Sequence, residues 1–328
     1  MTSAVAQASG GGQCGHMKAY DVLVVGGGAA GLSAALVLLR ARRTVVVVDS
    51  GAPRNAPAEH MHGFLSRDGM PPRDLLAEAR SEVTGYGGTF VDDTVVSVES
   101  GFEVRLAEAT PLSARRLVVA TGLRDELPDI PGVRERWGRD LLHCPYCHGY
   151  EVRDRPLGVL GGTPDAVDHA LLVRQWSPDI TLFPHTYDVT AEQREHLTAR
   201  GIRIVEGPVA RLVVDEDRLQ GVELVGGTVV PRAAVFVRPR FVPNSDLLTS
   251  LGCEADENGW VVRDATGRTT VAGVWVAGNA ADPRAQVITA AGQGSAAAIA
   301  LNADLVEEDV ERATAGQGAV HASAAPAS

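Results

Sequence analysis

Cysteine, positive charge and long apolar segments are all scarce in this sequence. The 328 residues include four cysteines and carry a net charge of −11. Such a charge argues against a nucleic-acid partner, because phosphates would be repelled rather than neutralised. The apolar runs stop short of the about 18 residues that a membrane-spanning helix needs, so we expect no membrane partner. The first sixteen residues lack a basic start followed by an apolar stretch, so we expect no secretory signal.

The few cysteines are unevenly placed. Cys144 and Cys147 form a Cys-x-x-Cys pair, whereas Cys14 and Cys253 stand alone. Without a secretory signal we predict a cytoplasmic, reducing location, in which such a pair is more often catalytic or metal-binding than structural. A zinc site would need two further ligands of suitable spacing, and neither isolated cysteine provides them. We therefore predict redox chemistry and no metal.

Length and composition predict two globular domains between two disordered tails. Hydrophobic residues make up 45% of the chain and charged residues 22%, as in ordinary globular proteins. Residues 1–16 and 311–328 are rich in small residues, and we expect both segments to be disordered. Translation could begin at Met1 or at Met17. We expect residues 17–122 and 241–310 to form one discontinuous domain and residues 123–240 to form a second domain inserted into it.

The first domain opens with a nucleotide-binding pattern. A strand over 21–25 leads into the glycine turn Gly26-x-Gly28-x-x-Gly31 and a helix ending near Arg40, and a second strand over 44–48 is followed by Asp49. This glycine spacing allows a sharp turn and brings backbone amides and a helix N-terminus close to a pyrophosphate. An acid after the second strand is placed to bind a ribose. A glycine-rich turn without a ligand is the alternative.

A similar pattern returns at the start of the inserted domain. A strand over 157–160 runs into Gly161-Gly162, then a helix is expected over 165–176 and a strand over 179–183. Further strands are expected at 90–97, 101–106, 114–119, 202–206, 209–214, 220–225 and 233–237, and a last helix at about 286–306. The expected fold is α/β, with two Rossmann-like domains of which the second is inserted in the first.

Four separated motifs now point to a family. They are the glycine fingerprint, Ala120-Thr121-Gly122, the Cys-x-x-Cys pair, and Ala277-Gly278-Asn279 followed by the 286–292 segment. In this order they resemble the low-molecular-weight thioredoxin reductases, which are FAD-dependent pyridine nucleotide-disulfide oxidoreductases, over about residues 20–306. The run Cys-Pro-Tyr-Cys-His-Gly-Tyr-Glu is more similar to the flavin-dependent dithiol oxidases, which close disulfides in natural products such as holomycin and gliotoxin.

The resemblance implies FAD as the cofactor and a homodimer as the assembly. The family has Asp where this chain has Asn279, which can still bond a ribityl hydroxyl. The loop around His62 corresponds to a family loop near the flavin, although a solvated loop is an equal alternative. The cofactor-binding residues implied are Gly26, Gly28, Ala29, Ala30, Gly31, Asp49, Ser50, Arg54, Asn55, His62, Ala120, Thr121, Gly122, Gly278, Asn279, Gln286, Val287 and Ile288.

The catalytic residues implied are Cys144, Cys147 and His148. By resemblance, Cys147 faces the flavin and Cys144 exchanges with the substrate. His148 stands where thioredoxin reductases carry Asp, and an imidazole can take and return thiol protons near neutral pH. His143 competes for that role, and a structural role for either histidine stays open.

The second nucleotide pattern departs from the thioredoxin reductases, and this argues against NADPH. Thr163 replaces the third glycine, whose missing Cβ lets a backbone approach a pyrophosphate. Asp165 adds negative charge there, and the arginines that hold a 2′-phosphate in the family are missing after the 179–183 strand. Arg174 or Arg194 could replace them from elsewhere.

We therefore predict an enzyme, a flavin-dependent thiol–disulfide oxidoreductase that oxidises a small dithiol with oxygen. An NADPH-dependent reductase acting on a thioredoxin-like protein is the first alternative. A non-enzymatic flavin redox sensor is the alternative from another class.

Overall fold

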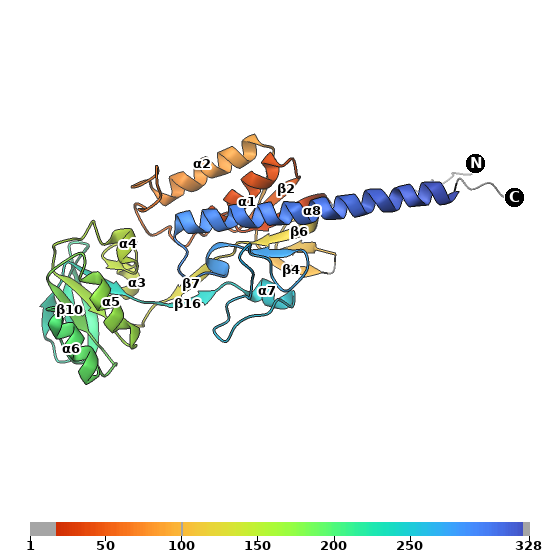
Figure 1. Ribbon diagram of the computed structural model, residues 1–328. Coiled ribbons are helices and arrows are strands. Elements are labelled where there is room, and N and C mark those ends of the chain that lie inside the picture. The colour runs from red at the N-terminus through yellow and green to blue at the C-terminus, as the bar shows by residue number, and fades with distance from the viewer. Residues whose placement is uncertain (1–17, 100, 324–328) are drawn as a thin grey trace, which may run out of the picture.

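The computed structural model describes residues 18–99 and 101–323 (Figure 1). The predicted disorder of residues 1–16, the choice between Met1 and Met17, and the last five residues of the predicted C-terminal tail lie outside the described residues. The described chain forms two bodies joined by a narrow connection, with the first and last parts of the chain together in one body and the middle of the chain in the other. This is the inserted arrangement expected from the sequence.

The first body is built on a seven-stranded sheet in the order β3-β2-β1-β6-β5-β4, with β17 also paired to β6. Strands β1, β2, β3, β6 and β17 are mutually parallel where they pair, whereas β4 and β5 run antiparallel to their neighbours. The strands are β1 Ala19–Val25, β2 Val45–Asp49, β3 Thr89–Asp92, β4 Val95–Glu99, β5 Glu103–Leu106, β6 Leu112–Val119 and β17 Val274–Val276.

Helices cover this sheet because its central strands are apolar on both faces. Val45–Val48 of β2 are all buried, which explains why that strand is a continuous valine run rather than an alternating pattern. One face packs against α1 and α8, and the other face packs against the segment containing Leu248 and Cys253. The helical elements of this body are α1 Ala29–Arg40, α2 Pro72–Gly85, α7 Asp246–Ser250, the short 3₁₀ helix Gly278–Ala280 and α8 Val287–Ser323.

The second body contains a five-stranded parallel sheet in the order β11-β10-β9-β15-β8 and a separate three-stranded antiparallel sheet, β12-β13-β14. Strands β9 and β15 are buried along their whole lengths. Its elements are α3 Val133–Arg136, β8 Leu141–Leu142, α4 Pro145–His148, β9 Leu157–Leu160, α5 Asp165–Val173, β10 Ile180–Phe183, α6 Ala191–Ala199, β11 Arg203–Ile204, β12 Val209–Asp215, β13 Arg218–Leu224, β14 Val229–Pro231 and β15 Ala234–Val237.

The two bodies are joined by a two-stranded antiparallel ribbon of β7 Leu123–Glu126 and β16 Arg240–Pro243 (Figure 1). The predicted domain boundaries, at 122/123 and 240/241, fall at this ribbon, and the division into folding domains stays a prediction. The α/β class with two Rossmann-like units, one inserted in the other, is confirmed.

Helix α8 corrects one expectation. It was expected to end near residue 306 and to be followed by a disordered tail from residue 311, but it continues to Ser323. Residues 299–315 are mostly alanine, leucine, glutamate and arginine, with no proline or glycine, so helix propensity carries the backbone on beyond the sheet. Within residues 18–99 and 101–323, every helix is too short or too polar to cross a bilayer.

Candidate active site

The turn between β1 and α1 shows two glycines that serve close packing. Gly26 has φ +104°, and a Cβ on it would lie 2.4 Å from the backbone oxygen of Ala120 on the neighbouring strand. A Cβ on Gly31 would lie 1.9 Å from the backbone oxygen of Gly26. Helix, turn and strand can therefore approach this closely only because both positions lack a side chain.

Gly28 faces open space instead. It is the N-cap of α1 with extended backbone, and no described atom lies within 4 Å of its Cβ position. As a glycine it offers no capping side chain, and the first turn of α1 is the uncharged Ala29-Ala30-Gly31-Leu32. The free amides and the positive end of the helix dipole are thus available to an anion, which fits the pyrophosphate of FAD.

Asp49 lies beside this turn. Its Oδ1 accepts a hydrogen bond of 3.0 Å from the backbone amide of Gly27. The carboxylate is therefore held at the end of β2 next to the open turn, which is where an acid meets a ribose hydroxyl in nucleotide-binding units.

A cavity of about 1220 Å³ runs from this turn to the cysteine pair. Its volume exceeds the range usual for small ligands and suits a dinucleotide. Gly31 and Ile288 lie outside the cavity wall, the first beneath the turn and the second 39% exposed. Of the predicted site residues, the cavity is lined by Gly26, Gly28, Ala29, Ala30, Asp49, Ser50, Arg54, Asn55, His62, Ala120, Thr121, Gly122, Cys144, Cys147, His148, Gly278, Asn279, Gln286 and Val287.

The Asn279 side chain is engaged within the protein. Its Nδ2 donates to the backbone oxygens of Asp282 and Ala285, at 2.8 and 3.0 Å. Its Oδ1 accepts a hydrogen bond of 3.4 Å from Arg54, whose guanidinium also binds Asp125 with two hydrogen bonds. Asn279 thus holds the turn before α8, and a contact with FAD stays a prediction.

The cysteines are held by the short helix α4. Cys144 and Cys147 form a disulfide with a Cα–Cα separation of 5.2 Å. Cys144 is the N-cap of α4, and its Sγ accepts a hydrogen bond of 3.2 Å from the backbone amide of Cys147. An amide directed at this sulfur stabilises a thiolate there once the disulfide opens.

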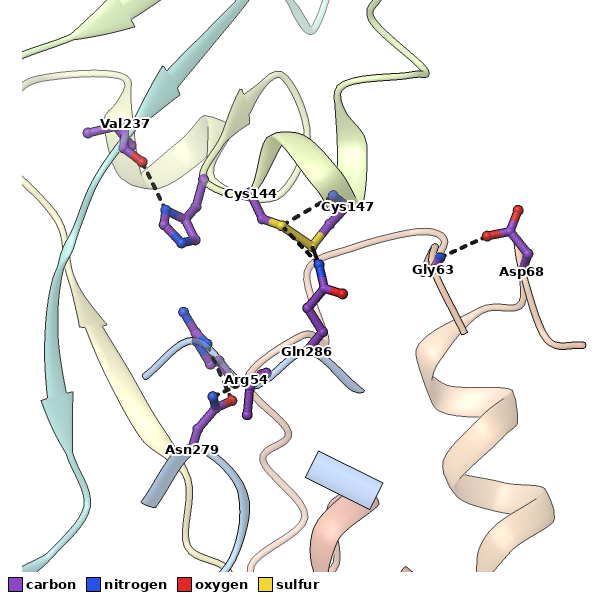
Figure 2. The surroundings of a disulfide bond; sticks show 10 residues. Arg54, Gly63, Asp68, Cys144, Cys147, Val237, Asn279 and Gln286 are labelled. Atoms are coloured by element: carbon purple, nitrogen blue, oxygen red, sulfur yellow. Dashed lines mark hydrogen bonds between the residues drawn. A yellow bond between two sulfur atoms is a disulfide. The ribbon is translucent and has the colours of Figure 1, made fainter. Parts of the chain in front are cut away.

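Gln286 approaches both sulfurs from the first body (Figure 2). Its Nε2 lies 3.9 Å from the Sγ of Cys144 and 3.8 Å from the Sγ of Cys147. The sequence predicted Gln286 as a flavin contact, and its contact with the sulfurs was missed. Because Gln286 directly precedes α8 and the cysteines belong to the inserted unit, this contact joins the two bodies at the reactive atoms.

Two histidines flank the disulfide, and burial lowers the pKa of each. Burial brings the pKa of His143 down to about 4, and its Nδ1 lies 3.3 Å from the backbone oxygen of Val237. That carbonyl fixes the neutral tautomer with the proton on Nδ1, so Nε2 is an acceptor. Burial also lowers the pKa of His148. Both rings are neutral near pH 7 and can accept a thiol proton, and the choice of His148 stays a prediction.

The loop around His62 lies on the cavity wall, but its imidazole contacts carboxylates. The Nδ1 is 3.4 Å from Asp68, and the Nε2 is 3.4 Å from Glu151 of the inserted unit. Glu151 closes the Cys-Pro-Tyr-Cys-His-Gly-Tyr-Glu run, and the sequence reasoning gave it no role. Its position in that run was the available signal.

The second nucleotide pattern builds a different helix start. The first turn of α5 carries Asp165 and Asp168, whereas the first turn of α1 is uncharged. Arg174 donates to the backbone oxygens of Arg200 and Ser177, and Arg194 forms an ion pair of 2.8 Å with Glu206. Both arginines that could have replaced the missing phosphate ligands are therefore engaged elsewhere.

The remaining predictions about cysteine and metal concern other parts of the fold. Cys253 is 6% exposed in the core of the first body, where burial raises the pKa of its thiol, so it packs as an apolar residue. Within residues 18–99 and 101–323, no group of three or more His, Cys, Asp or Glu side chains is arranged to hold a metal ion.

Comparison with known proteins agrees with this site. The family model described as pyridine nucleotide-disulphide oxidoreductase matches residues 20–294. Thioredoxin reductase sirT of Leptosphaeria maculans is 33% identical over 316 residues, covering 89% of this chain and 96% of the relative. A thioredoxin reductase of Listeria innocua is 27% identical over 319 residues, covering 92% and 98%.

Two solved structures share the fold closely. The crystal structure of HlmI is 60% identical, with a TM-score of 0.89 and coverage of 93% of this chain and 97% of that chain. A putative thioredoxin reductase TrxB from Bacillus anthracis is 34% identical, with a TM-score of 0.84 and coverage of 88% and 99%. The chain therefore belongs to the pyridine nucleotide-disulphide oxidoreductase family, as an FAD-dependent enzyme of the thioredoxin reductase type.

Proposed function

We propose that this enzyme oxidises a small dithiol to a disulfide through the Cys144–Cys147 pair and FAD, with oxygen as the final acceptor. One observation carries the proposal. The disulfide and the uncharged helix start of α1 line one cavity, and the start of α5 presents Asp165 to the same cavity, paired with Arg238, and carries Asp168 in its first turn. A route from dithiol to flavin is thus built, and a phosphate-bearing reductant meets two carboxylates.

The first step is thiol–disulfide exchange. A substrate thiolate attacks one sulfur of the Cys144–Cys147 disulfide, which forms a mixed disulfide and releases the other cysteine as a thiolate. The second substrate thiol then attacks the mixed disulfide. The substrate leaves as a cyclic disulfide, and Cys144 and Cys147 are left reduced by two electrons.

Protein groups stabilise the charges and protons of this exchange. The backbone amide of Cys147 is directed at the Sγ of Cys144, and the Gln286 amide lies within 4 Å of both sulfurs. His148 and His143 are neutral because burial lowers their pKa values, so either can take a proton from an incoming thiol. We infer that Cys144 exchanges with the substrate and that His148 is the proton acceptor.

FAD, when bound, would supply the acceptor for the two electrons of the reduced Cys144–Cys147 pair, and oxygen would take them up as hydrogen peroxide. The residues that would hold it are the Gly26–Gly31 turn, Asp49 and the 120–122 segment, with the start of α8. The overall reaction converts one dithiol and one oxygen molecule into one disulfide and one hydrogen peroxide.

Anaerobic mixing tests the direction of electron flow. We expect excess dithiothreitol, as a small dithiol probe, to bleach the flavin absorbance, and admission of air to restore it with formation of peroxide. We expect NADPH at micromolar concentration to leave the flavin oxidised. Rapid bleaching by NADPH would overturn the oxidase and favour a reductase.

The reductase is the second candidate, and the names of the relatives favour it. The relatives in Leptosphaeria maculans and Listeria innocua are both named thioredoxin reductase. In that case the same cysteines would pass electrons outward to a thioredoxin-like protein. NADPH-dependent reduction of an oxidised thioredoxin by the holoenzyme would establish this candidate.

Serine variants test the relay itself. Cys144→Ser and Cys147→Ser each remove one sulfur, so we expect both to abolish dithiol oxidation while FAD stays bound. Cys253→Ser is the matched control, because Cys253 is buried away from the cavity. Survival of turnover in both site variants would show that the pair carries no electrons.

We also infer that two copies of the chain associate, and that the protein works in the reducing environment of the cytoplasm. Ile299, Val306 and Val310 of α8 are 63%, 48% and 57% exposed, and their spacings of seven and four place them on one face of the helix. Exposed apolar stripes of this kind support association. Light scattering of the holoenzyme would show a dimer, and a monomer at micromolar concentration would contradict this.

A further inference from the structure

One loop of the first body reaches across to the turn that follows the cysteine pair. The loop spans residues 60–70, and the Nε2 of its His62 lies 3.4 Å from the Oε1 of Glu151. Glu151 stands four residues after Cys147. The contact therefore joins the first body to the segment that carries the disulfide.

The loop is held in shape from within. Met61 is 4% exposed, its amide donates to the backbone oxygen of Met70, and its own oxygen accepts from the Gly69 amide. Asp68 accepts a hydrogen bond of 2.8 Å from the Gly63 amide, which lowers the pKa of the Asp68 carboxyl. The Asp68 carboxylate is therefore charged, and its other oxygen lies 3.4 Å from the Nδ1 of His62.

His62 thus lies between two carboxylates. The Nδ1 is within hydrogen-bond distance of Asp68 in the same loop, and the Nε2 reaches Glu151 across the two bodies. The charged groups facing it are Asp68 from its own loop and Glu151 from the inserted unit, with the imidazole of His148 nearby. His62 therefore links Asp68 of its own loop to Glu151 of the inserted unit.

The loop also adjoins the residue that contacts the sulfurs. The Cβ position of Gly63 lies 3.8 Å from the Oε1 of Gln286, and the amide nitrogen of the same side chain lies 3.9 and 3.8 Å from Cys144 and Cys147. Figure 2 shows the Gly63–Asp68 bond and Gln286, all from the first body, next to the disulfide of the second body. Loop, Gln286 and disulfide form one continuous contact region.

The covalent connection between the bodies does not by itself fix their orientation. It consists of the β7–β16 ribbon, with four residues in each strand (Figure 1). A two-stranded ribbon of this length is marginally stable alone and twists readily. Non-covalent contacts between the two bodies must therefore keep the disulfide over the cavity. One of them is His62–Glu151, in which Glu151 lies four residues after Cys147.

We propose that the His62–Glu151 contact is a clasp between the two bodies that positions the disulfide segment in the cofactor cavity. His62 is then a positioning residue rather than a ligand of FAD or of the substrate. The clasp's effect on turnover rests on the proposed transfer of electrons from the cysteine pair to FAD, but its effect on structure does not.

The test uses His62→Gln, Glu151→Gln and the double variant of the full-length holoenzyme. His60→Gln is the matched control, because His60 belongs to the same loop but contacts Gly69 and Glu59 of its own body. Hydrogen–deuterium exchange measures the mobility of residues 61–70 and 148–154. Anaerobic mixing with dithiothreitol measures the rate constant of flavin reduction.

We expect faster exchange of both segments in the two single variants and in the double variant, and unchanged exchange in His60→Gln. The rate constant of flavin reduction should fall about two- to fivefold in each single variant, the range for a partly exposed ion pair, with no further loss in the double variant.

Unchanged exchange in the variants would overturn the clasp, and so would independent, additive losses in the double variant. A wild-type flavin that no dithiol reduces would overturn the proposed function instead. The clasp would then still be decided by the exchange measurement, so the two failures are distinguishable.

Discussion

Replacing Gly31 and Gly28 separately by alanine should show that two glycines of one motif serve different purposes. A Cβ at Gly31 would lie 1.9 Å from the backbone oxygen of Gly26 and 3.1 Å from a methyl carbon of Val24. The first of these atoms belongs to the backbone and cannot rotate away, so α1 must move off the sheet. Such overpacking costs about 3 kcal/mol, near the top of the range for core insertions.

For Gly28→Ala we expect the opposite result, which is a stable fold with weaker FAD binding. Its backbone is at φ −77° and ψ −177°, which alanine adopts without strain, and no described atom lies within 4 Å of the Cβ position. The fold should lose at most about 1 kcal/mol, the effect of alanine at a helix N-cap. The new methyl group, however, stands in the cavity beside the free amides of α1 and keeps a pyrophosphate away from them.

Thermal unfolding of the apoprotein and titration with FAD separate these effects. We expect Gly31→Ala to lower the melting temperature of the apoprotein by about 5 °C or more. Gly28→Ala should change it by about 2 °C at most and weaken FAD binding about tenfold or more, which is about 1.4 kcal/mol. Wild-type affinity in Gly28→Ala would refute the pyrophosphate site, and wild-type stability in Gly31→Ala would refute the packing argument.

Three further changes test other parts of the site. Gln286→Leu removes the amide near both sulfurs, and because those contacts are long we expect about a fivefold slower flavin reduction by dithiothreitol, with unchanged FAD affinity. Burial lowers the pKa of His169 to about 3, so the folded state keeps this imidazole neutral, and the stability this gives above pH 6.5 is lost as the pH falls toward 3. His169→Leu should therefore remove about 3 kcal/mol of the loss of stability between pH 6.5 and pH 4, which the melting temperature would show. Thr163→Gly with Asp165→Ser removes a Cβ and a charge from the second helix start, so NADPH should reduce the flavin about tenfold faster than in wild type, and no change would place the obstacle elsewhere.

Local sequence patterns predicted the strand–helix–strand units of both bodies, where the pattern was strong. The β1, α1 and β2 units and their β9, α5 and β10 counterparts each combine a buried apolar run with a glycine turn, which are signals within about 30 residues. Helix α2 was missed although Leu76, Ala79 and Val83 follow helical spacing and pack against the core. Helix α6 was also missed, although Thr190 and Gln193 form a capping box that the sequence displays.

Contacts between distant segments could not be predicted in the same way. Gln286 and Cys147 are 139 residues apart, and His62 and Glu151 belong to different bodies. No periodicity or spacing encodes which side chains meet across two bodies, because the meeting depends on how the β7–β16 ribbon orients them. Most of the residues predicted for the site lie on the cavity wall, but the partners of His62 and Gln286 required coordinates.

The two nucleotide-type units show how one architecture is given two tasks. Both place a parallel strand before a glycine turn and a helix, yet α1 begins with uncharged residues behind an open Gly28, whereas α5 begins with Asp165 and Asp168. The helix dipole adds positive charge at both starts, and in α5 its own carboxylates already neutralise that charge. We infer that the first unit retains the anion-binding capacity of the fold and that the second unit has lost it. The second unit keeps its parallel sheet and contributes Cys144 and Cys147 to the cavity that both units line.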